Sequence, residues 1–151
     1  MKIAIGSDHR GFTVKKKIIE YLRSKGYKVS DYGADSAESI DYPDIAIRVA
    51  EAVAARKSTY GILMCYSGQG MIMAANKVRG VRAALCVDPT YARFARAHNN
   101  ANVLVMPAGF IKYGVRMRSI INTFIRTEFE GGRHLRRIKK IGQYENSTRR
   151  I

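Results

Sequence analysis

The chain has 151 residues, of which 46% are hydrophobic and 26% are charged, as is ordinary for one globular domain. Twenty-seven Lys and Arg residues against twelve Asp and Glu residues give a net charge of +15, which favours nucleic acid or acidic small molecules as partners. Two cysteines in apolar contexts argue against a disulfide scaffold, and no apolar run is long enough for a membrane span or a signal-peptide core. We therefore expect a cytoplasmic protein with reduced thiols.

Apolar periodicity predicts strands and helices that alternate along the chain. Strands are expected at 2–7, 27–33, 59–65, 81–87 and 101–106, and helices at 12–26, 44–57, from about 70, 89–99, about 112–127 and 133–145. This order predicts a doubly wound, Rossmann-like α/β fold, in which helices cover both faces of a five-stranded parallel sheet in three layers. We expect one domain over 1–145 and a basic tail over 146–151 that frays.

In such sheets, ligands bind beyond the carboxyl ends of the strands. "SDH" (7–9) follows the first strand and "CYSGQG" (65–70) follows the third, and these two segments can converge. Asp88 and the segment 108–109 follow the fourth and fifth strands. The rule therefore places Cys65 in a candidate site.

The glycine loop that follows Cys65 excludes several phosphate-binding motifs. It is not a Walker loop, because no G-K-[ST] closes it, and the third small position of a dinucleotide fingerprint is Met73. A tyrosine-phosphatase loop would need an arginine at position 71, which is Met71. What remains is an oxyanion cradle, formed by backbone N–H groups around Gly68 and Gly70, with a thiol at its edge.

A thiol at the start of a helix can act as a base, because the helix N-terminus lowers the pKa of a nearby thiol. A thiolate beside N–H donors can remove a proton from carbon while the donors stabilise an enediolate. Free cysteine is also among the most buried residue types, so packing of Cys65 in the core stays open as the alternative. For Cys86, which has apolar neighbours in a predicted strand, we expect the core.

Several stretches together resemble the B-type ribose-5-phosphate isomerases, the family that includes galactose-6-phosphate isomerase subunits. The stretches are "IAIGSDHRGF" (3–12), "DYPDIA" (41–46), "GILMCYSGQGMIMAANK" (61–77), "VRAAL" (81–85), "HNNANVL" (98–104) and "EGGRH" (130–134). They span nearly the whole chain in order, and their combination is specific although no single stretch is.

The resemblance implies aldose–ketose isomerisation of a phosphorylated sugar through a cis-enediolate, without metal or cofactor. By that analogy Cys65 is the general base that moves the proton between C2 and C1. Ser67 and the amides through Gly70 cradle the enediolate oxygens with help from Asn99, and His98 is the acid that opens the furanose ring.

The resemblance also implies a binding set for the sugar and its phosphate. Asp8 holds sugar hydroxyls, Tyr42 lines the pocket, and His9, Arg133 and Arg137 grip the phosphate. Residues four apart share one face of a helix, so the two arginines can form a two-pronged clamp. A solvated basic face is the competing interpretation of the same pair.

His98 poses a geometric problem, because it ends a helix that follows the fourth strand. In its own chain it should lie toward the opposite edge of the sheet from Cys65. The resemblance implies that another copy of the chain supplies it. We therefore expect a homodimer, or a tetramer, with active sites at the subunit interface and a C-terminal helix that extends toward the partner.

This chain departs from the family at several positions near the expected pocket. Tyr66 and Gln69 replace a small and an apolar residue, so a ring and an amide lie within reach of the substrate. An arginine that the family often has after the fifth strand is Gly109 or Phe110 here, with Lys112 as a possible substitute. A lysine supplies charge without the bidentate fork of arginine.

Two rival functions stay open. The first is isomerisation of a six-carbon sugar phosphate, such as allose or galactose 6-phosphate, which the pocket near Tyr66 would decide. The second is a non-catalytic basic module that binds nucleic acid. The positive residues are scattered, at 15–17, Arg93, Arg96 and 133–140, so a solvated basic surface is expected instead.

Overall fold

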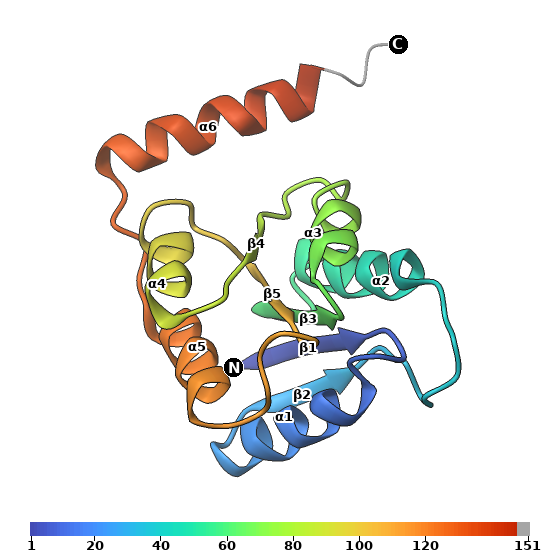
Figure 1. Cartoon of the computed structure of the whole chain (residues 1–151). Helices are drawn as coiled ribbons and strands as arrows, with labels where there is room; N and C mark the ends of the chain where they lie inside the picture. Colours follow the sequence, from blue (N-terminus) through green and yellow to red (C-terminus); the bar gives the residue numbers. More distant parts are fainter. Residues whose placement is uncertain (148–151) are drawn as a thin grey trace.

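The computed structural model describes residues 1–147. The elements in chain order are β1 (Lys2–Ser7), α1 (Phe12–Ser24), β2 (Lys28–Asp31), α2 (Tyr42–Ala54), β3 (Tyr60–Cys65), α3 (Gln69–Ala75), β4 (Ala83–Leu85), α4 (Pro89–Ala97), β5 (Val103–Pro107), α5 (Val115–Arg126) and α6 (Gly132–Ser147). They form a sheet with helices on both sides, and α6 lies beyond these layers (Figure 1).

The five strands form one parallel sheet in the order β2-β1-β3-β5-β4. The predicted doubly wound α/β fold is thus confirmed. Because β1 and β3 are neighbours, with Ser7 opposite Met64, the segments that leave their carboxyl ends start side by side. This adjacency brings the two predicted site segments together.

Alternate side chains of each strand supply two separate cores, since successive residues of a strand point to opposite faces. On β3, Ile62 and Met64 pack with α1, α4 and α5, whereas Leu63 and Cys65 pack with α2 and α3. Cys86 is fully buried, as predicted. Both faces of the sheet are therefore covered, and Cys65 lies on the α2–α3 side.

Several predicted bounds were wrong by a few residues, for local reasons. Helix α2 begins at Tyr42, because Pro43 fits the first helical turn, where no backbone N–H is needed. Strand β4 has three residues instead of the span 81–87. The backbone of Ala83, in β4, forms hydrogen bonds with the side-chain amide of Asn76 instead of with another strand on that side. Asn76 Nδ2 donates to Ala83 O at 3.0 Å, and Asn76 Oδ1 accepts from Ala83 N at 2.9 Å.

Helix α6 packs loosely on its own chain. Of its 16 residues only His134 is buried, while Leu135, Ile141 and Tyr144 are exposed. The helix runs to Ser147, so the first two residues of the predicted tail are helical, and 148–151 lie outside the described residues. No helix among residues 1–147 is both long enough and apolar enough to cross a membrane.

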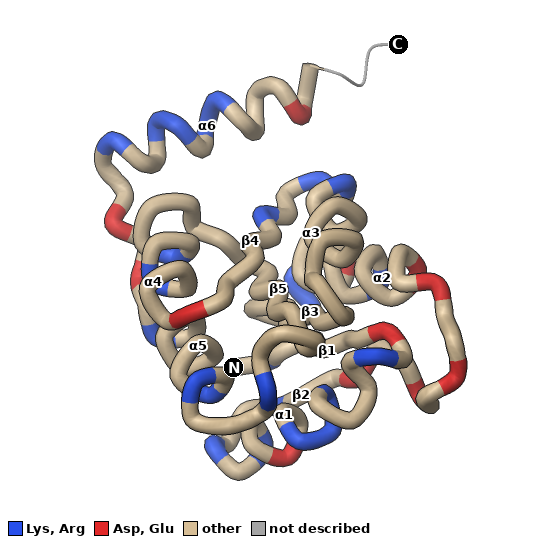
Figure 2. Tube along the Cα trace, viewed as in Figure 1, with Lys and Arg blue, Asp and Glu red and all other residues tan. Residues whose placement is uncertain are grey.

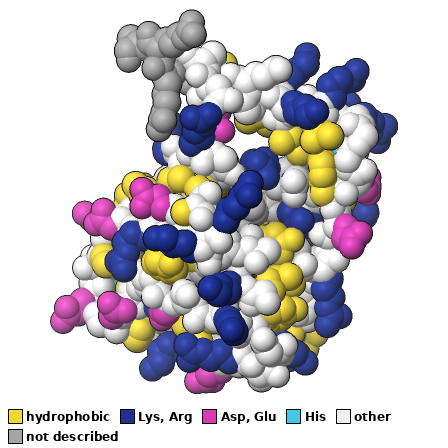
Figure 3. Space-filling model, turned by 180° about the vertical axis from the view of Figure 1, so that it is seen from behind, with side chains coloured by type: hydrophobic (Ala, Val, Ile, Leu, Met, Phe, Trp, Pro, Cys, Tyr) yellow, Lys and Arg dark blue, Asp and Glu magenta, His cyan; other side chains and the backbone are white. Residues whose placement is uncertain are grey.

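The positive charge is not all on the surface, which corrects the prediction for two residues. Lys15 is 1% exposed, and Arg96 is buried with its guanidinium 4.8 Å from the ring centre of Tyr60. The other Lys and Arg residues lie on α1, α5 and α6, on the segment between α3 and β4 and elsewhere along the chain in Figure 2, and over the face seen in Figure 3, without forming one stripe. This distribution favours a solvated surface over a nucleic-acid site.

Candidate active site

The turn after β3 holds the candidate catalytic thiol. Cys65 ends β3 and is 5% exposed. Gly68 has a φ of +79°, in the left-handed region that favours glycine, and a Cβ there would lie 2.5 Å from Leu85 Cδ1. This bend directs the Gly68 N–H to Cys65 Sγ at 3.2 Å. Because hydrogen bonds to charged acceptors are the stronger ones, the turn suits an anionic sulfur, although the residue is also packed in the core.

The start of α3 is packed against the start of α2. A Cβ on Gly70 would lie 2.6 Å from Cε2 and Cζ of Tyr42, so only glycine lets this ring approach. Tyr42 therefore lies next to the glycine turn, where the sequence predicts a pocket-lining residue. Ser67 Oγ accepts a hydrogen bond from Gln69 N at 3.3 Å, and the Gln69 side chain is exposed.

The loop after β1 lies beside this turn and carries Asp8 and His9. Asp8 is 7% exposed, and its Oδ1 accepts hydrogen bonds from the N–H groups of Arg10 at 3.0 Å and Gly11 at 3.1 Å. Its Oδ2 has no partner in the described part of the chain. His9 is half-buried and accepts from Ile40 N through Nδ1 at 3.5 Å, which leaves Nε2 for a ligand. One carboxylate oxygen thus builds the loop, and the other can hold a hydroxyl.

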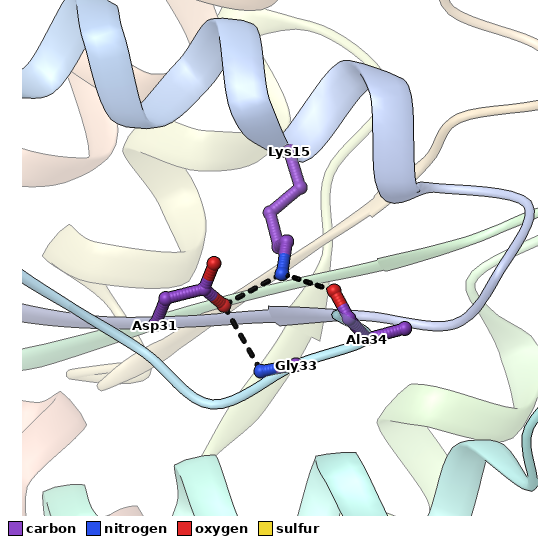
Figure 4. A network of polar contacts seen from close by, with 4 residues as sticks. All are labelled: Lys15, Asp31, Gly33 and Ala34. Atoms are coloured by element: carbon purple, nitrogen blue, oxygen red, sulfur yellow. Dashed lines mark hydrogen bonds and ion pairs between the residues drawn. The ribbon is translucent and has the colours of Figure 1, made fainter. Parts of the chain in front are cut away.

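A buried lysine fixes the segment that flanks this loop (Figure 4). Lys15 Nζ, from α1, donates to Asp31 Oδ1 and to Ala34 O, both at 2.6 Å, and Gly33 N donates to the same Asp31 oxygen at 2.9 Å. In turn, Ser7 N donates to Gly33 O at 2.8 Å and Ala34 N donates to Ser7 O at 2.7 Å. The lysine therefore anchors the end of β1 just before Asp8. The sequence carries no plain signal for this role.

The Tyr66 ring lies over the loop after β5. A Cβ on Gly109 would lie 2.3 Å from Tyr66 Cδ2. The centre of the Tyr66 ring is 5.4 Å from the centre of the Phe110 ring and 5.1 Å from the guanidinium carbon of Arg10. The ring occupies the space that a side chain at position 109 would need. Lys112 is exposed, and no hydrogen bond, ion pair or cation–π contact joins it to these rings among residues 1–147.

A second group of polar side chains forms where α4 ends and α6 begins. His98 Nε2 and His134 Nε2 lie 3.6 Å and 3.7 Å from the same oxygen, Oε2 of Glu130. The two imidazole rings are stacked with their centres 4.2 Å apart and their planes 5° from parallel. His134 lies between Arg133 and Arg137 in the sequence, and its position there suggests a structural or contact role. Glu130 was missed, although it opens the "EGGRH" stretch.

The expected phosphate clamp lies on α6. Arg133 and Arg137 are both exposed. A cleft of about 860 Å³ separates α6 from α4 and β4, and Phe94, Asn99 and Ile141 are among its lining residues. Asn99 therefore faces the cleft that α6 borders.

The predicted residues thus fall into two groups that one chain does not bring together. Cys65 ends β3, whereas His98 ends α4, which runs back from the carboxyl edge of the sheet. Since β3 has six residues at about 3.3 Å each, about 20 Å along the strands separates the carboxyl edge, where Cys65 lies, from the opposite edge, toward which α4 runs. In Figure 1 the start of α6 and the end of α4 lie on the left, while the β1 arrow points to the right.

Comparisons with known proteins add the chemical context. Residues 3–141 match the family model described as Ribose/Galactose Isomerase. The Escherichia coli protein named Ribose-5-phosphate isomerase B is 40% identical over 145 residues, which cover 95% of this chain and 96% of that protein. The Clostridium thermocellum Ribose-5-Phosphate Isomerase B structure has a TM-score of 0.96 at 43% identity and covers 98% of this chain and 99% of that one. The Mycoplasma genitalium structure, which holds ribulose-5-phosphate, has a TM-score of 0.92 at 46% identity and covers 96% of each chain.

Proposed function

Because the chain belongs to the ribose/galactose isomerase family, we propose that it interconverts ribose 5-phosphate and ribulose 5-phosphate. The observation that carries this proposal is Cys65 Sγ, held by the Gly68 N–H at the carboxyl edge of the sheet beside Asp8 and His9. Relatives that match over nearly the full length are named for this reaction, and one of them holds its product, ribulose-5-phosphate.

Cys65 acts as the base in the proton transfer. The thiolate removes the proton from C2 of the open-chain aldose, a C1–C2 double bond forms, and the carbonyl oxygen O1 takes up the electron pair. The proton then returns to C1, the O2–H proton passes to O1, and O2 becomes the carbonyl oxygen of the ketose. No oxidant or reductant is consumed. Ser67 and the amides through Gly70 offer hydrogen bonds to the enediolate oxygens, which is where negative charge develops.

A homodimer completes this site. His98, Asn99, Arg133 and Arg137 are too far from Cys65 to act on the same substrate within one chain. A two-fold axis allows each subunit to place these residues over the partner's glycine turn. The loosely packed α6 and its apolar cleft support this arrangement, because they leave apolar side chains for a second copy of the chain to cover.

The phosphate is then held from both sides. His9 Nε2 approaches it from the β1 loop, and the exposed guanidinium groups of Arg133 and Arg137 approach it from α6 of the partner copy. Two arginines four residues apart suit a phosphate, which accepts bidentate hydrogen bonds.

A cytoplasmic location remains a prediction from the composition. Both cysteines are free thiols, as expected in a reducing compartment.

The six-carbon rival depends on the space near Tyr66. The ring is turned onto Gly109 and held between Phe110 and Arg10, so it fills one side of the turn that bears Cys65. A longer sugar would need that space. A five-carbon substrate is therefore the better match.

The direct test is to incubate the purified protein with ribose 5-phosphate and to follow ribulose 5-phosphate, with allose 6-phosphate and galactose 6-phosphate in parallel. We expect turnover that Cys65→Ala nearly abolishes, while Cys86→Ala, a buried cysteine on the other face of the sheet, retains it. Full activity in Cys65→Ala would refute the role of the base. No turnover of any sugar phosphate, with steeply salt-dependent binding of polynucleotide, would instead favour the nucleic-acid module.

A further inference from the structure

Two histidines and one carboxylate form a compact group outside the glycine turn. The donor atoms of His98, Glu130 and His134 all lie within 4.8 Å of one another. His98 is the C-cap residue of α4, and His134 is in the first turn of α6. Only His98 has a place in the proposed reaction, so the presence of the other two needs an explanation.

The "EGGRH" segment builds this group. Glu130 N donates to Ala97 O at 3.0 Å, which fastens the segment to the last turn of α4. Gly131 and Gly132 have φ values of +68° and +52°, so the chain reverses there at two left-handed positions that favour glycine. The reversal returns His134 over the ring of His98. Segment 130–134 therefore places a carboxylate and a flat ring against one imidazole.

The geometry suits a proton better than a metal ion. A metal ion lies in the plane of each imidazole ring that binds it, along the nitrogen lone pair. The ring planes of His98 and His134 are within 5° of parallel with centres 4.2 Å apart, so no point between them lies in both planes. Two stacked imidazolium ions would repel each other, so the arrangement favours a single imidazolium beside one carboxylate.

The surroundings favour His98 as the ring that carries this proton. It sits at the C-terminus of α4, where the helix dipole favours a cation, whereas His134 sits at the N-terminus of α6, where the dipole opposes one. Burial lowers the pKa of His134, and so do His98, Arg133 and Arg137, while Glu130 raises it. The His98 side chain is 32% exposed and that of His134 only 9%, so water also stabilises the charge better on His98.

We propose that Glu130 and His134 are positioning residues that keep a proton on His98, poised for opening the sugar ring. This inference rests on the proposed function through the role of His98. In the reaction, the bond between C1 and the ring oxygen O4 breaks, and O4 takes the proton from His98. The O1–H electron pair forms the C1 carbonyl as that proton passes to water, and His98 regains a proton from solvent.

The first experiment does not depend on catalysis. The chain has three histidines, so NMR can follow each imidazole as the pH changes. Glu130→Gln removes the carboxylate charge, and we expect the titration midpoint of the His98 resonance to move to lower pH. Glu128→Gln is the matched control, because Glu128 is exposed in the same loop and makes no ion pair among residues 1–147. An unmoved His98 resonance in Glu130→Gln would overturn the inference.

The second experiment separates ring opening from proton transfer at carbon. Ribulose 5-phosphate cannot close a furanose ring, because its 5-hydroxyl is esterified. Exchange of its C1 proton with deuterated water therefore reports the Cys65 step alone. We expect Glu130→Gln to slow conversion of ribose 5-phosphate about tenfold and to leave this exchange within about twofold. An equal loss of both rates would indicate general damage to the fold and contradict the inference.

A third variant tests which ring carries the proton. His134→Phe keeps a flat ring on His98 and removes the second imidazole. We expect His134→Phe to slow conversion of ribose 5-phosphate less than Glu130→Gln does. A larger decrease in this rate for His134→Phe would show that His134 delivers the proton, which would contradict the role of His98. If the His98 resonance moves as expected in a protein that converts no ribose 5-phosphate, the proton-holding group stands and the proposed function is wrong.

Discussion

Replacing Lys15 by methionine should destabilise the protein more than its place in a lysine run suggests. Its Nζ is the partner of both Asp31 Oδ1 and Ala34 O at 2.6 Å, and the residue is 1% exposed. Methionine keeps most of the aliphatic volume, so the change removes the charge and its two hydrogen bonds with little change in packing.

The size of the effect follows from what remains. The carbonyl of Ala34, a residue 2% exposed, loses its lysine donor, which costs about 1–3 kcal/mol. Asp31 keeps its hydrogen bond from Gly33 N, and its side chain is 34% exposed, so water screens its charge. Loss of the ion pair with Lys15 should therefore cost an amount at the low end of about 0–1 kcal/mol. The lysine no longer has to be dehydrated, which offsets part of the loss. We expect a net decrease in the free energy of unfolding of about 2 kcal/mol.

Urea unfolding at a fixed protein concentration measures this difference. With a slope of about 2 kcal/mol/M, the midpoint should fall by about 1 M. Lys16→Met is the control, because Lys16 is the exposed neighbour on the same helix, and it should stay within about 0.5 kcal/mol of the parent protein. Equal midpoints for the two variants would refute the reasoning that the buried network holds the end of β1.

Three further outcomes follow from individual groups. Arg137→Ala should raise KM for ribose 5-phosphate with little change in kcat, since the phosphate is held alike before and during proton transfer, and a loss confined to kcat would contradict this role. Burial raises the pKa of Cys86 to about 12, so its thiol should resist Ellman's reagent in the folded protein and react only on unfolding. The unfolded chain loses this proton at a lower pH than the folded one, so the free energy of unfolding should fall as the pH rises above about 9 toward 12. Rapid labelling of folded Cys65→Ala, in which Cys86 is the remaining cysteine, would contradict this. The pKa of His134 is lowered in the folded protein, so as the pH falls the unfolded chain takes up a proton on this imidazole before the folded protein does. The free energy of unfolding should therefore decrease as the pH falls below about 6.5. Urea titrations at about pH 5 and about pH 7 should show a smaller decrease for His134→Gln than for the parent protein.

The part of the site at the carboxyl edge could be predicted from the sequence. Parallel strands end at one edge of the sheet, and the apolar β3 next to β1 brings Cys65 beside Asp8. The left-handed Gly68 was also foreseeable, since a glycine between a strand and a helix suggests a sharp turn. The direction of α4 was enough to predict that His98 lies far from Cys65.

Other features depend on tertiary contacts that leave no periodic pattern. Lys15 is one of three adjacent lysines, and only the packing of α1 on the sheet shows that it is buried. Tyr42 and Gly70 are 28 residues apart in the sequence, and nothing local signals that they approach each other. Glu130 has a weak signal, a carboxylate before two glycines, but its partners become visible only when α6 returns to α4.

The central claim is that a working site needs Cys65 from one chain and His98 from another. The most direct measurement mixes two inactive variants, Cys65→Ala and His98→Asn, by refolding them together. Random pairing makes about half of the dimers mixed, each with one intact site of two, so about a quarter of the parent activity should return. No recovery above the two variants alone, in a mixture shown to exchange subunits, would contradict the shared site.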